Sequence, residues 1–118
     1  MAAGRLTPEV TFITPEALKT RLDAGEYVCL IDARGLSDFD TAHIPGAQWC
    51  APGLLEQRMA RAAPTTYVPL VVYCSRGEES ARSVPTLRHL GYAHVFVMQG
   101  GFVAWCAAGF PTEAGVVG

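Results

Sequence analysis

The sequence predicts a single α/β domain in which a central, mainly parallel sheet is flanked by helices on both faces. Three short apolar runs, at residues 27–31, 69–73 and 94–98, lack the polar alternation of a half-exposed strand. Helix signals stand before, between and after these runs. Buried strands that alternate with helices are typical of a parallel sheet with both faces covered.

Length and composition agree with one compact domain over residues 1–118, with a core at about 10–112. Of the 118 residues, 50% are hydrophobic and 17% are charged. The net charge of −2 offers no basic surface to nucleic acid or an anionic membrane, and no apolar run is long enough to span a bilayer. The first residues lack the apolar region of a secretory signal. We therefore expect a cytoplasmic protein, a monomer or weak homodimer, with neither a nucleic-acid nor a membrane partner.

Five elements are expected in the first half of the chain. They are a helix from Thr14 to Gly25, the strand 27–31, a helical turn over 37–41, a turn over 43–47 and a helix over 53–63. Thr14 can cap the first helix, Pro15 suits its first position, and Gly25 suits its end. Asp32 stops the strand, and Phe39 is expected to pack inward from the helical turn.

Four elements are expected in the second half. They are the strand 69–73, a helix over 80–90, the strand 94–98 and a last helix between Gly100 and Gly109. Pro85 removes a hydrogen bond inside the helix over 80–90, so a kink is expected between Ala81 and Pro85.

Cys74 follows directly on the apolar strand 69–73 and is the candidate nucleophile. In open α/β sheets, ligands bind at the carboxyl ends of the strands. The loop after Cys74 leads into a helix, and backbone N–H groups at such a place favour thiolate over thiol. Gly77 can adopt a positive φ that turns its N–H inward. Ser80 either donates its hydroxyl to the sulfur or caps the helix, and both interpretations stay open.

Three segments, in this order, resemble the signatures of single-domain rhodaneses, a sulfurtransferase family. The segments are Asp32-Ala33-Arg34 with Asp38-Phe39 and His43-Ile44-Pro45-Gly46-Ala47; Cys74 to Ser80 with the helix to Gly91-Tyr92; and Gln99-Gly100-Gly101-Phe102-Val103-Ala104-Trp105 with Ala108-Gly109-Phe110-Pro111. The resemblance implies a rhodanese-like fold without cofactor or metal. It also implies that Cys74 accepts a sulfane sulfur as a persulfide and passes it to a thiophilic acceptor such as cyanide or a thiol. The donor would be a small sulfur-containing anion, such as thiosulfate, or a protein persulfide.

The loop is expected to bind the substrate, because a persulfide is an anion that needs several donors around its outer sulfur. The expected substrate-binding residues are Ser75, Arg76, Gly77, Glu78, Glu79, Ser80 and Arg34. Many family members that use thiosulfate carry an arginine where this chain has Glu79. With Arg76 and Glu78, the loop side chains carry one net negative charge, which predicts weak use of thiosulfate and a protein persulfide or less charged donor. The alternative is that both glutamates face solvent and favour the helix N-terminus.

Other polar residues have structural interpretations that we prefer. Asp32 is expected to cap the loop that follows its strand, and Arg34 to pair with a nearby carboxylate. His43 is expected to bond to backbone and hold its turn, while His89 and His94 are expected at the surface. The two tryptophans are expected to pack in the core or a groove.

The four cysteines are expected to be reduced, because they are widely spaced and contain no Cys-x-x-Cys pair. Cys29 and Cys106 are expected as small core hydrophobes. An alternative for Cys50 is a resolving thiol for Cys74.

Two other functions are alternatives to sulfur transfer. A Cys-x5-Arg phosphatase needs an arginine six residues after the cysteine, where this chain has Ser80. A non-catalytic interaction module or sulfur carrier would keep the same fold. Persulfidation of Cys74 by a donor separates the module from the enzyme, but the sequence alone does not separate carrier from enzyme.

Overall fold

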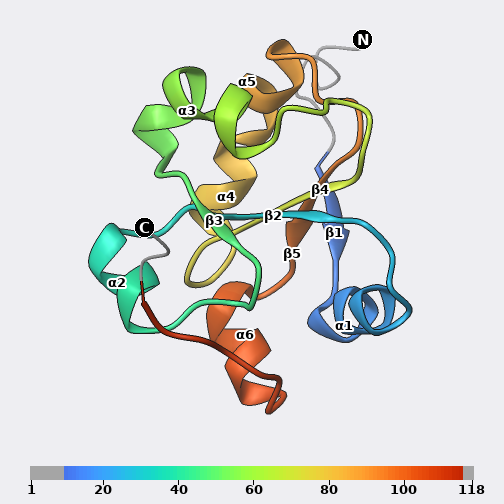
Figure 1. The fold of residues 1–118 in the computed structure, drawn as a ribbon, viewed down its shortest axis with the longest axis vertical. Coiled ribbons are helices and arrows are strands. Elements are labelled where there is room, and N and C mark those ends of the chain that lie inside the picture. Colours follow the sequence, from blue (N-terminus) through green and yellow to red (C-terminus); the bar gives the residue numbers. More distant parts are fainter. Residues whose placement is uncertain (1–9, 116–118) are drawn as a thin grey trace, which may run out of the picture.

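The computed structural model describes residues 10–115 and contains one five-stranded parallel sheet (Figure 1). The strands are β1 (Thr11–Ile13), β2 (Cys29–Asp32), β3 (Gln48–Trp49), β4 (Leu70–Tyr73) and β5 (Val95–Met98). Their order across the sheet is β1-β5-β4-β2-β3, and all four pairings are parallel. The strand that ends at Tyr73 is therefore the central one.

Helices cover both faces of this sheet, as predicted (Figure 1). They are α1 (Pro15–Asp23), α2 (Leu36–Thr41), the 3-10 turn η2 (Pro52–Leu54), α3 (Leu55–Ala62), α4 (Glu78–Arg82), α5 (Val84–His89) and α6 (Gly101–Ala107). Alternate residues of β4 enter opposite cores: Val72 packs with side chains of α3 and α5, whereas Val71 packs with side chains of α1, α2 and α6. The central strands are thus buried on both faces, which explains their continuous apolar sequence.

The two edge strands were not predicted. Strand β1 has three residues and β3 has two, and Phe12 of β1 is 53% exposed. Segments of two or three residues are too short to show the hydrophobic periodicity that identifies a strand. They are strands because β1 pairs with β5 and β3 pairs with β2. Elsewhere the predicted strands agree with the observed ones to within two residues.

The predicted helices form with shifted boundaries. The Thr14 hydroxyl accepts a hydrogen bond from the N–H of Ala17 at 3.0 Å, which confirms the expected cap of α1. Phe39 is buried, also as expected. The helix predicted over 53–63 begins instead as the 3-10 turn η2 and continues as α3.

The helix predicted over 80–90 is two helices, α4 and α5, that meet at Ser83. Pro85 is the second residue of α5, where a helix needs no N–H donor, so the predicted kink is a full break. Helix α4 begins at Glu78, and Gly77 is its cap residue. Of the two interpretations left open for Ser80, the helix cap is therefore not the one observed, because Ser80 lies inside α4.

None of the helices within residues 10–115 combines the length and the hydropathy that crossing a membrane requires.

Candidate active site

Cys74 is the first residue after the central strand β4, at the carboxyl edge of the sheet. It is 2% exposed and lines a hollow of about 280 Å³. The other lining residues are Ser75, Arg76, Glu78, Glu79 and Arg82. The strand, the loop and α4 thus bring together one thiol and the charged side chains of one short segment.

Two backbone N–H groups donate to the sulfur of Cys74. The donor–acceptor distance is 3.1 Å from the N–H of Gly77 and 3.4 Å from that of Ser80. The Oγ atom of Ser80 lies 3.3 Å from the same sulfur. Three polar groups, from the loop residue Gly77 and from Ser80 in the first turn of α4, therefore converge on Sγ, an arrangement that suits a sulfur bearing negative charge.

The Ser80 hydroxyl has two partners but only one proton to donate. Its oxygen lies 3.2 Å from the carbonyl oxygen of Gly77 and 3.3 Å from Sγ of Cys74. With a thiol, S–H donates to Ser80 while Ser80 donates to Gly77. With a thiolate, the hydroxyl turns to donate to the sulfur. Of the two roles left open for Ser80, the structure shows contact with the sulfur.

Gly77 gives the loop its shape. Its φ is +100°, a left-handed conformation that residues with a Cβ disfavour, so the expected positive φ is confirmed. This conformation aims the Gly77 N–H at the sulfur. Because α4 has only five residues, the stabilisation comes from individual N–H groups more than from a long helix dipole.

The loop rests against the start of α6, a support that sequence reasoning missed. The N–H groups of Phe102 and Val103 donate to the carbonyl oxygens of Cys74 and Ser75, at 2.7 and 3.0 Å. A Cβ on Gly101 would lie 2.5 Å from backbone atoms of both Cys74 and Ser75. Gly101 is therefore required for this close approach, and the only signal in the sequence was the adjacent pair of glycines.

The hollow contains balanced charges. Arg82 lines it together with Arg76, Glu78 and Glu79, so two cations face two anions. Arg82 was not among the predicted site residues, although it follows Glu78 by one helical turn and so lies on the same side of α4.

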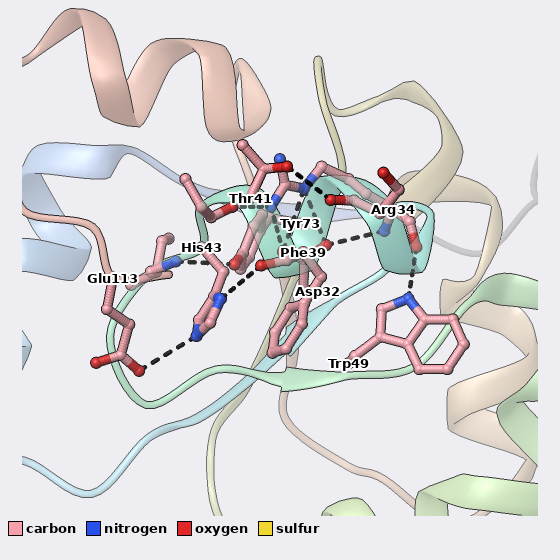
Figure 2. A network of polar contacts seen from close by, with 11 residues as sticks. Asp32, Arg34, Phe39, Thr41, His43, Trp49, Tyr73 and Glu113 are labelled. Atoms are coloured by element: carbon pink, nitrogen blue, oxygen red, sulfur yellow. Dashed lines mark hydrogen bonds and ion pairs between the residues drawn. The ribbon is translucent and has the colours of Figure 1, made fainter. Parts of the chain in front are cut away.

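Arg34 is paired inside a separate network (Figure 2). Its Nε and Nη2 atoms lie 3.0 and 2.7 Å from the two carboxylate oxygens of Asp32, whose Oδ1 also accepts the backbone N–H of Arg34 at 2.9 Å. Nη2 also donates to the carbonyl oxygen of Ala42, and the guanidinium lies 4.1 Å from the ring centre of Phe102. Burial opposes the charge on Arg34, but the hydrogen bonds and charge of Asp32 outweigh it and raise the pKa of Arg34. The expected ion pair and loop cap are both present, whereas Arg34 is not among the residues that line the hollow over Cys74.

Tyr73 connects this network to the turn that begins at His43. Its hydroxyl oxygen accepts the N–H of Ile44 at 3.1 Å. Burial, followed by the negative charge of Asp32, raises the pKa of Tyr73. Tyr73, the residue before Cys74, is thus an uncharged side chain that ties the core to this turn.

His43 holds its turn, as predicted. Its ring lies against Phe39, Nδ1 is 2.7 Å from the carbonyl oxygen of Phe39, and Nε2 is 3.2 Å from Oε2 of Glu113 (Figure 2). The backbones of His43 and Glu113 also bond to each other in both directions. His43 is therefore a structural tie, and His89 and His94 lie at the surface as expected.

All four cysteines are free. Cys29 is half-buried and packs against the core as expected, but the prediction for Cys106 is wrong. Cys106 is exposed because α6 buries Gly101 and Trp105 and turns the next residue outward.

Cys50 is not placed to act as a resolving thiol. Asp32 pairs with Trp49 on one side and Tyr73 on the other. The residues that follow these two, Cys50 and Cys74, are therefore about two strand spacings apart, or about 9–10 Å. A disulfide needs Cα atoms within about 7 Å. Burial raises the pKa of the Cys50 thiol, which further reduces its reactivity.

The two tryptophans pack as expected. Trp105 is 1% exposed and its indole N–H donates to the carbonyl oxygen of Pro111, whereas Trp49 is half-buried and donates to that of Arg34. In the part of the chain that the structure describes, no group of three His, Cys, Asp or Glu side chains is arranged to hold a metal ion.

A model of the rhodanese-like domain matches residues 14–108. The probable adenylyltransferase/sulfurtransferase MoeZ of Mycobacterium tuberculosis is 34% identical over 93 residues, which are 79% of this chain and 24% of MoeZ. This chain thus spans about a quarter of that relative. A sulfurtransferase from Allochromatium vinosum is 32% identical over 105 residues, which are 89% of this chain and 96% of the relative.

Solved structures agree with the sequence comparisons. The rhodanese-like domain of the Anabaena protein Alr3790 superposes with a TM-score of 0.80 at 32% identity, covering 90% of this chain and 80% of that one. The family model, over residues 14–108, includes the strand, loop and helix around Cys74 and the turn that begins at His43. This chain therefore belongs to the family of rhodanese-like domains.

Proposed function

We propose that this chain is a sulfurtransferase that carries sulfane sulfur on Cys74. The observation that carries the proposal is the convergence of the Gly77 N–H, the Ser80 N–H and the Ser80 hydroxyl on Sγ. Relatives named sulfurtransferases support the same class of reaction.

The proposed reaction has two steps. The Cys74 thiolate attacks the outer sulfur of the donor, a new S–S bond forms, and the donor's S–S bond breaks with its electron pair leaving on the donor fragment. With thiosulfate that fragment is sulfite. An acceptor thiolate or cyanide then attacks the outer sulfur, and Sγ leaves as a thiolate. No external oxidant or reductant is consumed, because the sulfur only changes partners.

Loop donors would serve both steps. The N–H groups of Gly77 and Ser80 donate to Sγ of Cys74. They would stabilise its negative charge when Sγ is the nucleophile in the first step, and again when it is the leaving group in the second. The outer sulfur would occupy the hollow above Cys74, among the residues from Ser75 to Arg82. There it would meet exposed Arg76 and Arg82 as the nearest cations.

The donor that we favour is a protein persulfide or another donor of low charge. Thiosulfate is a dianion, and a pocket selective for it would present net positive charge. Here Glu78 and Glu79 offset Arg76 and Arg82. The acceptor in this proposal is a thiol or cyanide.

Intact mass spectrometry after incubation with thiosulfate, without reductant, tests the proposal. Wild type and the Cys106→Ser variant should gain one sulfur atom that cyanide removes, and Cys74→Ser should gain none. Cys106 is the matched control because it is an exposed thiol that non-specific sulfur chemistry would also modify.

A second donor completes the experiment. If thiosulfate does not load Cys74 but a persulfidated cysteine desulfurase does, the chain is a sulfurtransferase with a protein donor. If neither donor loads Cys74, the domain is an interaction module and the proposal fails. Discharge of the loaded protein to small acceptors would distinguish an enzyme from a carrier that serves one partner.

A further inference from the structure

A second site lies beside the edge strand β3, apart from the Cys74 hollow. Two hollows, of about 180 and 280 Å³, share Gln48, Trp49 and Arg58 in their linings. We call the combined feature the Trp49 groove. We propose that the Trp49 groove binds an extended segment of a partner protein in which an apolar side chain is followed by acidic side chains.

The 280 Å³ half of the groove is basic. Arg61 and Gln57 of α3 line it with the three shared residues, and it contains no acidic residue. Within residues 10–115, neither Arg58 nor Arg61 forms an ion pair with a carboxylate. Two cations beside two side-chain amides form a surface that matches carboxylates.

The 180 Å³ half supplies apolar surface. It includes Leu36, which is 44% exposed, and the buried residues Phe39 and Ala47. Its one acid, Glu113, is already engaged: its Oε2 atom lies 3.2 Å from Nε2 of His43 and accepts a hydrogen bond from the N–H of Gly46. A free inorganic anion would use only the basic half, whereas a peptide would use both.

Two contacts within the protein hold the centre of the groove in place. The indole N–H of Trp49 donates to the carbonyl oxygen of Arg34 at 2.7 Å, which fixes the ring. The guanidinium of Arg58 lies 5.2 Å from the centre of that ring, within range of a cation–π contact. A preformed surface binds a segment without the cost of ordering its own side chains.

Trp49, at the centre of the groove, ends β3 at the carboxyl edge of the sheet, which is also the edge where Cys74 lies. Trp49 and Tyr73 both pair with Asp32, so they are separated by about two strand spacings, or about 10 Å. About three residues of extended chain cover that distance. A partner held in the Trp49 groove therefore has other groups within reach of the Cys74 hollow, and this last step rests on the proposed sulfur transfer.

Titration with a capped peptide, Gly-Leu-Gly-Glu-Glu-Gly, tests the groove by nuclear magnetic resonance on the full chain. The indole N–H signal of Trp49 should shift and saturate, while that of buried Trp105 should stay fixed. The Arg58→Ala/Arg61→Ala variant should bind about fivefold to tenfold more weakly. The Arg21→Ala/Arg88→Ala variant loses the same charge from α1 and α5, outside the groove, and should change the affinity by less than about twofold.

Peptides with glutamine for glutamate, or serine for leucine, should bind more weakly than the parent peptide. Equal binding of the glutamine peptide, or no shift of Trp49 at any concentration, would overturn the proposal. Inorganic phosphate that reproduces the shifts with the same affinity would assign the site to a free anion instead. A Trp49 shift that follows protein concentration without peptide would assign it to a second copy of this chain. Binding to Cys74→Ser should equal binding to wild type, so this test is independent of the sulfur chemistry.

Discussion

The backbone N–H of Gly77 donates to the sulfur of Cys74 at 3.1 Å, and the φ of +100° at Gly77 is what aims it there. The hydrogen bond to the thiol therefore depends on a backbone conformation that favours glycine. It also gives the first prediction.

The Gly77→Ala variant should lose most of its sulfur transfer. A Cβ at this φ costs about 1–2 kcal/mol, which the loop can relieve by rotating the N–H away from the sulfur. We expect the rate of persulfide formation to fall by about tenfold or more. Gly25→Ala is the control, because Gly25 has a φ of +80° with open space around it. Gly25→Ala should lose similar stability and keep its rate, and an equal loss of rate in both variants would contradict the role of Gly77.

Gly101→Ala should disturb the Cys74 loop through its contact with the start of α6. The added Cβ would lie 2.5 Å from backbone atoms of Cys74 and Ser75, so the loop and α6 must separate. We expect a loss of both activity and stability, measured by persulfide loading and by urea unfolding. Gly109→Ala changes a glycine with φ +78° and no atom within 4 Å, so it should leave loading unchanged. Full loading by Gly101→Ala would show that the α6 support is dispensable.

Ser80→Ala should slow transfer by about tenfold or more, because it removes the hydroxyl that lies 3.3 Å from Sγ while keeping the Ser80 N–H. Ser83→Ala is the matched control, since Ser83 is also buried and its hydroxyl donates to the Ser80 carbonyl, away from the sulfur. Single-turnover discharge by cyanide measures both variants. Identical rates for the two would remove Ser80 from the mechanism.

Glu79→Arg should improve the use of thiosulfate. The substitution changes the side chains around the hollow from balanced charge to a net charge of +2. The KM for thiosulfate should fall severalfold, and the gain should shrink as salt screens the charges. Glu56→Arg makes the same charge change on α3, outside this hollow, and should leave the KM alone. An unchanged KM in Glu79→Arg would disprove the repulsion argument.

Tyr73→Phe tests the buried hydroxyl through alkaline stability. Burial and the charge of Asp32 raise the pKa of Tyr73, so above about pH 10 the unfolded chain ionises this group first. Stability from Tyr73 is therefore complete below pH 10 and decreases as pH rises, by at most about 1.4 kcal/mol per pH unit. At neutral pH, Tyr73→Phe should be less stable by about 1–3 kcal/mol, because the Ile44 N–H loses its acceptor.

The deficit of Tyr73→Phe should narrow as the pH rises past 10, as measured by urea unfolding between pH 8 and 11. Tyr67→Phe is the control, because Tyr67 is 76% exposed. A deficit that stays constant with pH would show that Tyr73 ionises alike in the folded and unfolded chain.

The features that the sequence predicts correctly are those determined by residues close together in the chain. The central strand before Cys74 is a continuous apolar run, and Gly77 and Ser80 follow within six residues of Cys74, in the loop and the first turn of α4. What was missed depends on packing between distant segments. β1 and β3 are strands only through their neighbours, and the contact of Gly101 with the loop joins two segments that the sequence separates. Cys106 was misplaced because the buried stripe of a seven-residue helix is too short to locate from its pattern.

The contact between α6 and the Cys74 loop has a consequence for how the protein is made. Cys74, Gly77 and Ser80 have all been synthesised once the ribosome reaches Ser80, yet the loop carbonyls of Cys74 and Ser75 gain their partners only from Phe102 and Val103. A nascent chain therefore has a thiol before it has the framework that shapes the loop around it. The loop around Cys74 should therefore take its final shape only once synthesis has passed α6.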